Sequence, residues 1–375
     1  MSHSPEIPSP SDKLAHDALG SGEAAQEQSP KVAALLKHFA QDGLTAEDCR
    51  AVVAKRDYIA RQKPTTLVAN VEAVVHRFTA DGLTTRDYLR AVVKQPSLFG
   101  QKPETVIANI ESVVRQFAAD GLTARHYLRA AVKQQSLFGQ KPETVIANIE
   151  GVVHQFATEG LAIHEYLRAA VKQPSLFSQK PEKVIANIDG IVRRFAIQGL
   201  TIREYLRTVV KQPSLFSQKP ETVVANIEGV VRQFAAGGLT ARQYLRAAMK
   251  QPSLFCQKPE TIIGHIRLLD SMHQAGLLPI PAGRPALFEF IVKNPLLISL
   301  ADDNLHLREL AAYVSDHPDS KTLIRKTRPY VEELLAQALR PRGTHDATDG
   351  NSRNGSHART LLLNALRREG YLKER

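Results

Sequence analysis

The sequence repeats itself with a period of 39 residues, and this repetition constrains the fold more than any single motif does. A clean unit, residues 82–120, reads GLTTRDYLRAVVKQPSLFGQKPETVIANIESVVRQFAAD. Residues 31–42 match the second half of a unit, so the array begins on a half-repeat. A Gly-Leu step opens each unit, at Gly43, Gly82, Gly121, Gly160, Gly199 and Gly238, and Gly276 follows at a spacing of 38 residues.

The first half of each unit predicts a short amphipathic helix. In the clean unit we expect it to start after Thr84 as N-cap and to run to about Lys94, because Pro96 ends it. One face of this helix is apolar and carries Tyr88, Leu89, Val92 and Val93. The following Ser97-Leu98-Phe99 segment is expected to form a single helical turn that packs inward.

The second half predicts a longer helix that starts at Lys102-Pro103-Glu104. Proline is tolerated in the first turn of a helix, and glutamate complements the helix dipole there. Its apolar stripe covers more than three turns and consists of Val106, Ile107, Ile110, Val113, Val114 and Phe117. Gly121 then supplies the C-terminal break.

Neither helix pair can cover its own apolar stripe, and stacking successive pairs removes this problem. The sequence therefore predicts an all-α fold, a right-handed α-solenoid of tandem 39-residue repeats with two to three helices each. We expect a disordered leader at residues 1–30, the repeats at 31–278 and a degenerate C-terminal capping repeat at 279–340. A flexible linker and a short basic helix are expected at residues 341–375.

Composition and motifs narrow the classes of function. The formal net charge of +11 and the isoelectric point of about 9.6 favour acidic partners. No apolar run is long enough to cross a membrane, and the two cysteines, Cys49 and Cys256, are too isolated for a disulfide framework or a metal site. No nucleotide-binding, zinc-protease or hydrolase motif occurs. We therefore expect no enzymatic activity, no catalytic residue, no metal and no cofactor.

The recurring outward chemistry is a basic stripe on the first helix, where Arg86, Arg90 and Lys94 fall at i, i+4 and i+8. The stripe recurs in four further units, as Arg125, Arg129 and Lys133; Arg168 and Lys172; Arg203, Arg207 and Lys211; and Arg242, Arg246 and Lys250. Stacked stripes form a two-dimensional field of cations that neutralises phosphates without reading bases. A solvated face without function, or ion pairs that join neighbouring units, are the alternatives, because acids such as Asp87 lie nearby.

Three other columns are expected to serve stacking between repeats. Small residues recur inside the second helix, where Ala73, Ser112, Gly151, Gly190 and Gly229 indicate close approach of an adjacent repeat. An asparagine column is expected to join repeats through hydrogen bonds and consists of Asn70, Asn109, Asn148, Asn187 and Asn226. A tyrosine column lies on the apolar face and is interpreted as core, at Tyr88, Tyr127, Tyr166, Tyr205 and Tyr244.

The order of Gly-Leu step, helix, Lys-x-Pro-x-Leu-Phe and helix resembles the repeats of mitochondrial transcription termination factors over roughly residues 31–315. The Pro-Ser-Leu-Phe steps at Pro96, Pro174, Pro213 and Pro252 carry this resemblance. It implies a helical solenoid that binds nucleic acid. The near-identical units and the Ser/Pro-rich leader also resemble tandem-repeat type III effectors of plant-associated bacteria. Neither resemblance implies a catalytic residue.

Two hypotheses of function follow, and both describe a non-catalytic binding protein that we expect to be monomeric and not bound to a membrane. One is a protein that binds DNA or RNA through the basic stripes. Its contacts are expected to be backbone-directed, because positions such as Gly100, Gly139, Ser178, Ser217 and Cys256 vary too little for a base code. The alternative is a scaffold for a partner or host protein. The expected location is the cytoplasm or, for an effector, a host cell reached without a signal peptide.

Overall fold

The computed structural model describes residues 30–55, 61–274 and 281–298, and every regular element in these ranges is a helix. The expected leader, the end of the capping repeat beyond residue 298 and the basic C-terminal helix lie outside the described residues. The chain divides into two compact units. The first unit comprises residues 1–111 and 131–139, and the second comprises 112–130 and 140–375.

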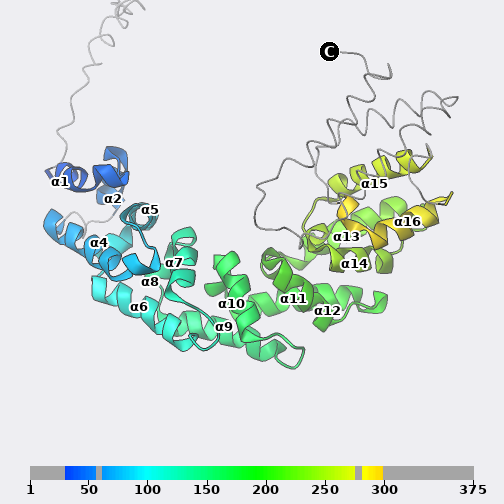
Figure 1. Ribbon diagram of the computed structural model, residues 1–375, viewed down its shortest axis with the longest axis horizontal. Helices are drawn as coiled ribbons and strands as arrows, with labels where there is room; N and C mark the ends of the chain where they lie inside the picture. The colour runs from blue at the N-terminus through cyan, green and yellow to red at the C-terminus, as the bar shows by residue number, and fades with distance from the viewer. Residues whose placement is uncertain (1–29, 56–60, 275–280, 299–375) are drawn as a thin grey trace, which may run out of the picture. The chain divides into compact units, whose positions relative to one another are not determined.

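Helices of about ten residues alternate with helices of about fifteen along the array (Figure 1). The first helices of successive repeats are α2 (Ala46–Lys55), α5 (Thr85–Lys94), α7 (Ala124–Lys133), α10 (Ile163–Lys172), α12 (Ile202–Lys211), α14 (Ala241–Lys250) and α16 (Arg284–Lys293). The second helices are α1 (Pro30–Phe39), α4 (Pro64–Phe78), α6 (Pro103–Gln116), α9 (Pro142–Phe156), α11 (Pro181–Phe195), α13 (Pro220–Phe234) and α15 (Pro259–Gln274). The prediction of two helices per unit is confirmed.

Short turns of 3-10 helix connect the helices at most of these junctions. Those that follow first helices are η3 (Pro96–Gly100), η4 (Pro174–Phe177), η6 (Pro213–Phe216), η8 (Pro252–Phe255) and η9 (Pro295–Ile298). Those that follow second helices are η1 (Ala40–Asp42), η2 (Thr79–Asp81), η5 (Ala196–Gln198) and η7 (Ala235–Gly237). Leu98 and Phe99 in η3 are buried, so the inward-packing turn predicted between the helices is confirmed.

Local signals explain where the first helices begin and end. Thr201 caps α12 by accepting a hydrogen bond from the backbone N–H of Glu204 at 3.2 Å, while the Glu204 carboxylate accepts one from the Thr201 N–H, also at 3.2 Å. This reciprocal capping box satisfies two donors that the helix itself leaves unpaired. At its other end the helix stops before Pro213, which has no N–H to continue it.

The second helices end on a left-handed glycine. Gly82 has a φ of +88° and Gly199 one of +87°, a conformation that other residues adopt only with strain. The N–H of the following leucine bonds back to the last phenylalanine of the helix, as Leu200 does to the carbonyl of Phe195 at 3.2 Å. The predicted glycine break is therefore confirmed, and it turns the chain directly into the next first helix.

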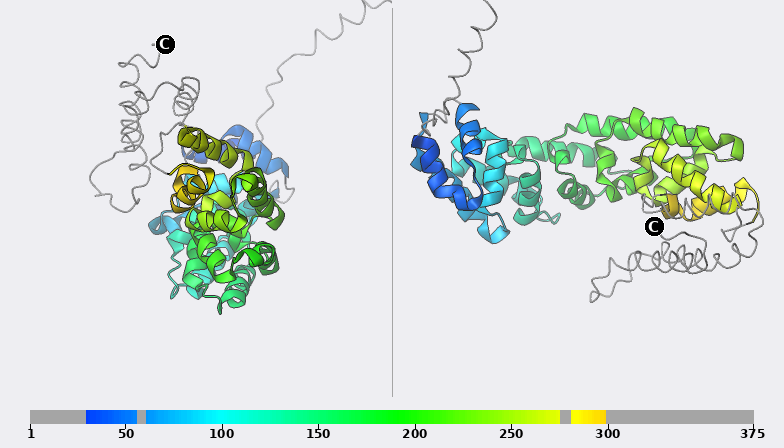
Figure 2. Two further views of the ribbon diagram at one scale, coloured as in Figure 1. Left: turned by 90° about the vertical axis from the view of Figure 1, so that its right-hand side faces the viewer. Right: turned by 90° about the horizontal axis from the view of Figure 1, so that it is seen from above.

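Equivalent helices pack against each other from repeat to repeat in the second unit (Figures 1 and 2). The second helices α9, α11, α13 and α15 pack in succession, and so do the first helices α10, α12, α14 and α16. The all-α repeat fold is confirmed, whereas the right-handed sense remains a prediction. Of the predicted apolar positions, Ile107, Val114 and Val93 are only half-buried, and the others are buried.

Tyrosine and phenylalanine rings join neighbouring repeats within the core. Tyr166 meets Phe216 of the next repeat edge-to-face at a ring-centroid distance of 5.3 Å, and Tyr127 meets Phe177 in the same way at 5.4 Å. The tyrosine column is buried, and burial raises the pKa of the Tyr166 hydroxyl far above its ordinary value. The interpretation of this column as core is confirmed.

The asparagine column joins repeats, through a partner that periodicity alone does not identify. The Asn187 side-chain amide donates to the backbone carbonyl of Phe216 in the next repeat at 3.0 Å, and Asn148 donates likewise to Phe177 at 3.1 Å. In the last repeat His265 replaces asparagine, and its Nδ1 lies 2.8 Å from the carbonyl of Ile298. The side chains therefore bond to main-chain carbonyls of the following turn and not to each other.

Glycines inside the second helices allow the next repeat to approach closely. A Cβ atom added to Gly190 would lie 2.8 Å from the Pro220 ring, and one added to Gly151 would lie 2.7 Å from the Pro181 ring. Each proline opens the second helix of the following repeat. The expected stacking role of this column is confirmed for these glycines.

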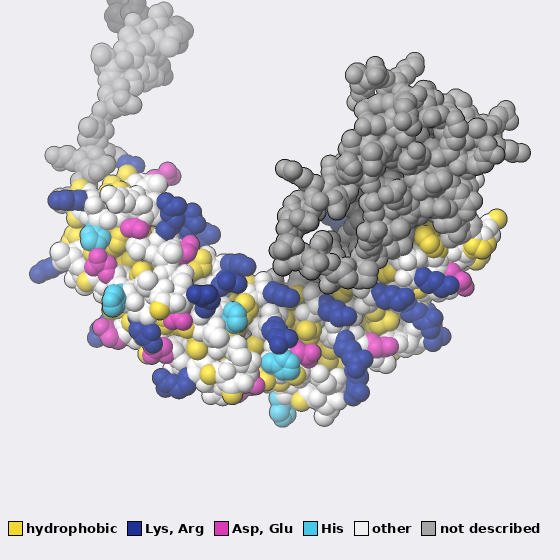
Figure 3. Space-filling view, viewed as in Figure 1, with side chains coloured by type: hydrophobic (Ala, Val, Ile, Leu, Met, Phe, Trp, Pro, Cys, Tyr) yellow, Lys and Arg dark blue, Asp and Glu magenta, His cyan; other side chains and the backbone are white. Residues whose placement is uncertain are grey.

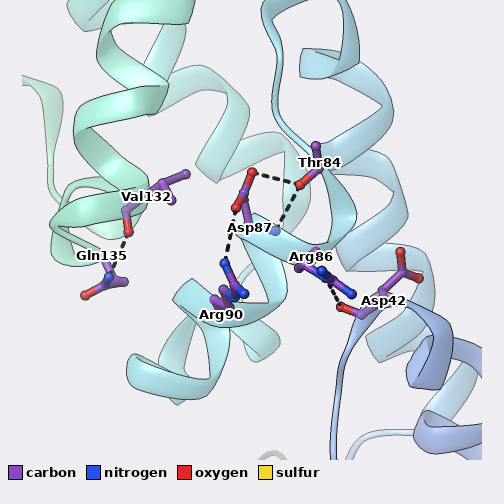
Figure 4. Close-up of polar contacts among 7 residues, drawn as sticks. All are labelled: Asp42, Thr84, Arg86, Asp87, Arg90, Val132 and Gln135. Carbon is purple, nitrogen blue, oxygen red and sulfur yellow. Dashed lines mark hydrogen bonds and ion pairs between the residues drawn. The ribbon is translucent and has the colours of Figure 1, made fainter. Parts of the chain in front are cut away.

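Two repeats depart from the pattern in ways that the structure explains. Gln135 stands where other repeats have proline, and its amide donates to the Val132 carbonyl at 2.8 Å (Figure 4). The turn that follows is accordingly the short α-helix α8 (Ser136–Gly139). In the degenerate last repeat, Arg284 makes two contacts of 3.1 Å with the buried carboxylate of Asp270, an ion pair between α15 and α16.

We expect Gly190→Ala to lower the free energy of unfolding by about 1 kcal/mol. The clash with the rigid Pro220 ring, about 1–3 kcal/mol for overpacking, outweighs the gain of about 1 kcal/mol in helix propensity. Urea unfolding of the full chain measures the change. In a Pro220→Ala background the same substitution is expected to become stabilising, and a destabilisation of equal size there would refute the contact.

The cysteine in α2 provides a probe of the N-terminal repeat. Cys49 is buried, and burial, with a smaller effect of the neighbouring Asp48 carboxylate, raises the pKa of its thiol to about 11. Since the thiolate is the reactive form, Cys49 is expected to react with a disulfide reagent at pH 8 only after urea unfolding. The variant Cys256→Ser isolates its signal, and fast labelling of this variant in native buffer would contradict the packing of α2.

Candidate functional site

The fourteen stripe residues predicted from the sequence all have exposed side chains. Along each first helix they recur every four residues, which corresponds to about 6 Å of rise. Packed helices lie about 8–10 Å apart, so the stripes of α10, α12 and α14 form adjacent rows of cations. Figure 3 shows Lys and Arg side chains that recur over the surface, with Asp and Glu between them.

Few of these cations are neutralised within the described residues. Arg90 is the one stripe residue with an ion pair there, and its Nη1 lies 4.0 Å from the Asp87 carboxylate on the same helix (Figure 4). That carboxylate also accepts a hydrogen bond from the Thr84 hydroxyl at 2.8 Å and so serves to cap α5. An exposed pair of this kind contributes little to stability.

Ion pairs between repeats lie instead on the second helices. Arg77 of α4 pairs with Glu111 of α6, and Arg194 of α11 pairs with Glu228 of α13. His38 of α1 lies 2.7 Å from Glu72 of α4 in the same relation. Each pair spans 34 residues, so one helix position bonds to an acid on the next second helix. These acids form pairs with residues on second helices and not with the basic stripes of the first helices.

The first cation of the stripe has a second role that the sequence pattern did not reveal. Arg86 Nε donates to the carbonyl of Asp42, in the turn that ends the preceding repeat, at 3.4 Å (Figure 4). Arg203 Nη2 donates in the same way to the Thr158 carbonyl at 3.4 Å. These arginines therefore help to fasten successive repeats, whereas Arg90 and Arg207 make no such contact with a described residue.

A cleft of about 340 Å³ lies between the turn at Gly160 and helix α12. Arg203 and Arg207 line one side of it, and Glu159 and Glu165 lie on the other. Glu165 accepts a hydrogen bond from the Ala162 N–H at 3.3 Å and caps α10. The cleft therefore presents two guanidinium groups to solvent beside carboxylates, one of which is engaged in capping.

The described residues carry no exposed Phe or Tyr side chain. Their tyrosines are all buried, and Phe234 and Phe290 are half-buried while the other phenylalanines are buried. Binding surfaces for single-stranded nucleic acid usually stack bases on exposed aromatic rings. Contacts of this face with a ligand would therefore depend on charge and hydrogen bonds.

Other chemistry is sparse in the same ranges. No group of three or more His, Cys, Asp or Glu side chains is placed to hold a metal ion among the described residues. No described helix combines the length and the apolar character needed to cross a membrane.

No protein-family model matches the chain, and no curated protein matches it either.

The hydrogen bonds of Arg86 and Arg203 to the preceding repeat predict that these arginines contribute to stability. The double variant Arg86→Gln/Arg203→Gln is expected to lower the free energy of unfolding by about 1 kcal/mol, because it removes two contacts between repeats. The matched variant Arg90→Gln/Arg207→Gln is expected to change it by less than about 0.5 kcal/mol. Urea unfolding compares the two, and equal effects would show that the contacts to Asp42 and Thr158 do not hold the repeats.

Proposed function

We propose that the chain is a non-catalytic repeat protein that binds nucleic acid through the basic stripes of its first helices. The observation that carries this proposal is the segregation of charge. Glu111 and Glu228 on second helices pair with arginines of the preceding repeat, whereas among the described residues Arg90 is the one exposed stripe cation with an ion pair. A polyanion is the partner that such a field of cations attracts best. The resemblance to mitochondrial transcription termination factors points the same way.

Recognition is proposed to be directed mainly at the backbone. Arginines and lysines recur at equivalent positions, so neighbouring repeats offer the same donors and cannot distinguish different bases. Side chains that vary among first helices, such as those of Asp87, Glu204 and Gln243, accept hydrogen bonds from the N-cap threonine and so take part in capping. The absence of exposed Phe and Tyr rings in the described residues also argues against stacking on single bases.

A second candidate function, a scaffold for a partner protein, is favoured by a groove on the second helices. The groove has a volume of about 890 Å³ and lies between α11 and α13. Its floor is small and apolar, with Ala186, Gly190 and Ala225, and its rim carries both signs of charge. Such a groove is suited to binding a peptide segment of a partner protein. In this case the protein is proposed to be a bacterial effector that acts on a host protein inside a host cell. If the protein is not such an effector, we propose a cytoplasmic location for either function.

Binding to a fluorescent 20-base-pair DNA and to a 20-nucleotide RNA across a salt series tests the nucleic-acid function. We expect the logarithm of affinity to fall linearly with the logarithm of salt concentration. The variant with Glu at Arg129, Arg168, Arg207 and Arg246 is expected to lose binding by at least about a hundredfold, because it replaces four cations by anions.

A control variant with the same change in net charge tests whether binding depends on where the cations lie or only on the net charge of the protein. Lys37, Arg115, Arg193 and Arg232 are exposed cations near the C-terminal ends of second helices, and replacing these four by Glu gives the same net charge. The control is expected to retain most of its affinity. Equal losses in both variants, or wild-type binding that ignores salt, would contradict the proposed interface.

A further inference from the structure

The groove between α11 and α13 lies apart from the basic stripes, because its lining comes from these two second helices and from Lys219 at the start of α13. Both helices belong to the second compact unit and pack directly against each other. The volume of about 890 Å³ falls in the range of ligand-binding clefts. Arg193, Lys219 and Ala186 on its lining are exposed, so the groove is open to solvent along its length. An open groove is better suited to a chain segment that lies along it than to an enclosed small molecule.

Small and aliphatic residues form the floor of this groove. Ala186 and Ala225 are exposed, and Val224 is only half-buried although it lies on the apolar side of α13. Gly190 adds no side chain to the floor, and the Pro220 ring packs so closely against it that a Cβ atom there would lie 2.8 Å away. The repeat core therefore leaves apolar surface uncovered in the groove, and burying that surface against a partner is favourable.

Cations predominate among the charged residues of the lining. Arg193, Arg194 and Lys219 stand against the two acids Glu221 and Glu228. Arg194 and Glu228 form an ion pair with each other between α11 and α13, so their charges balance. Arg193 and Lys219 then remain, with Glu221 as the remaining acid of the lining.

The two remaining cations are poorly neutralised by the residues that the structure describes. Lys219 makes no ion pair within 4.0 Å with any of them. Nη2 of Arg193 lies 3.7 Å from the Asp189 carboxylate on the same helix, but the arginine side chain is 79% exposed, and such a pair contributes little. Glu221 lies in the first turn of α13, where the positive end of the helix dipole offsets its charge. The groove therefore combines a positive edge with an apolar floor.

We infer that this groove binds an acidic, extended segment of a partner protein. An apolar side chain of the segment lies on Val224 and Ala225, and a neighbouring carboxylate lies between Arg193 and Lys219. Clusters of cations recognise acidic motifs in this way, and complementary charge gives such contacts their specificity. A nucleic-acid backbone would leave the apolar floor unused, and for this reason a peptide is favoured. The inference rests on the second candidate function, the scaffold for a partner protein, and does not depend on the stripes.

Three fluorescent nine-residue peptides serve as probes for the full-length chain. One consists of three Glu-Leu-Ser units, and the other two replace every Glu by Gln or every Leu by Ser. The Glu-Leu-Ser peptide is expected to bind at least about tenfold more tightly than either of the others. The first replacement removes the charges that face Arg193 and Lys219, and the second removes the apolar side chains that cover the floor.

Two variants that each lose two positive charges locate the binding. The groove variant is Arg193→Gln/Lys219→Gln, and the control is Lys183→Gln/Lys293→Gln, whose exposed lysines lie outside the groove lining. The groove variant is expected to bind the Glu-Leu-Ser peptide at least about tenfold more weakly, and the control to stay within about twofold of the wild type. All four positions are exposed, so the melting temperature of both variants is expected to change by less than about 2 °C.

Binding of the 20-base-pair DNA to the same proteins separates this inference from the nucleic-acid function. Both variants are expected to keep the wild-type affinity for DNA within about threefold. Equal affinity of the wild type for the three peptides, or equal losses in the two variants, would overturn the groove inference alone. Loss of DNA binding in the groove variant, without peptide binding to the wild type, would assign the groove to nucleic acid and overturn it too. Failure of the wild type to bind DNA would overturn the function of the stripes and leave the groove inference intact.

Discussion

The contact between one repeat and the next is the interaction on which the rest of the structure depends. A single pair of helices leaves an apolar stripe uncovered, and it acquires a core only when the next pair packs against it. In the second unit this contact is built from three parts, namely the Tyr166–Phe216 ring pair, the bond from Asn187 to the Phe216 carbonyl, and the fit of Pro220 against Gly190. All three converge on the turn and on the first turn of the following second helix, which fixes how equivalent helices align.

That alignment also determines where charges gather. Because equivalent positions stack, any outward residue that recurs in the sequence becomes a row on the surface. Glu111 and Glu228 form ion pairs with Arg77 and Arg194 of the preceding second helices. Within the part of the chain that the structure describes, the first helices form no ion pair between repeats, so their cations remain exposed to solvent. Function is therefore proposed on the surface that stacking does not use.

The sequence was sufficient to predict the elements and most of the core. Proline, glycine and capping threonine act locally, which is why the bounds of α5 follow from Thr84, Lys94 and Pro96. The sequence predicted which columns lie between repeats, but not the individual partner atoms, because these depend on how the repeats align. Periodicity predicted that Asn187 joins two repeats through a hydrogen bond, but not that its partner is the main-chain carbonyl of Phe216. For the same reason Arg86 looked like a purely outward cation, although it bonds to the preceding turn.

The central claim is that a polyanion lies on the first-helix stripes, and lysine acetylation footprinting tests it most directly. The chain is acetylated with and without saturating 20-base-pair DNA, and each lysine is quantified by mass spectrometry. The account predicts protection of the stripe lysines Lys133, Lys172 and Lys211, while the exposed Lys37 and Lys183 on second helices stay reactive. Protection confined to Lys37 and Lys183, or none at any stripe lysine, would contradict it.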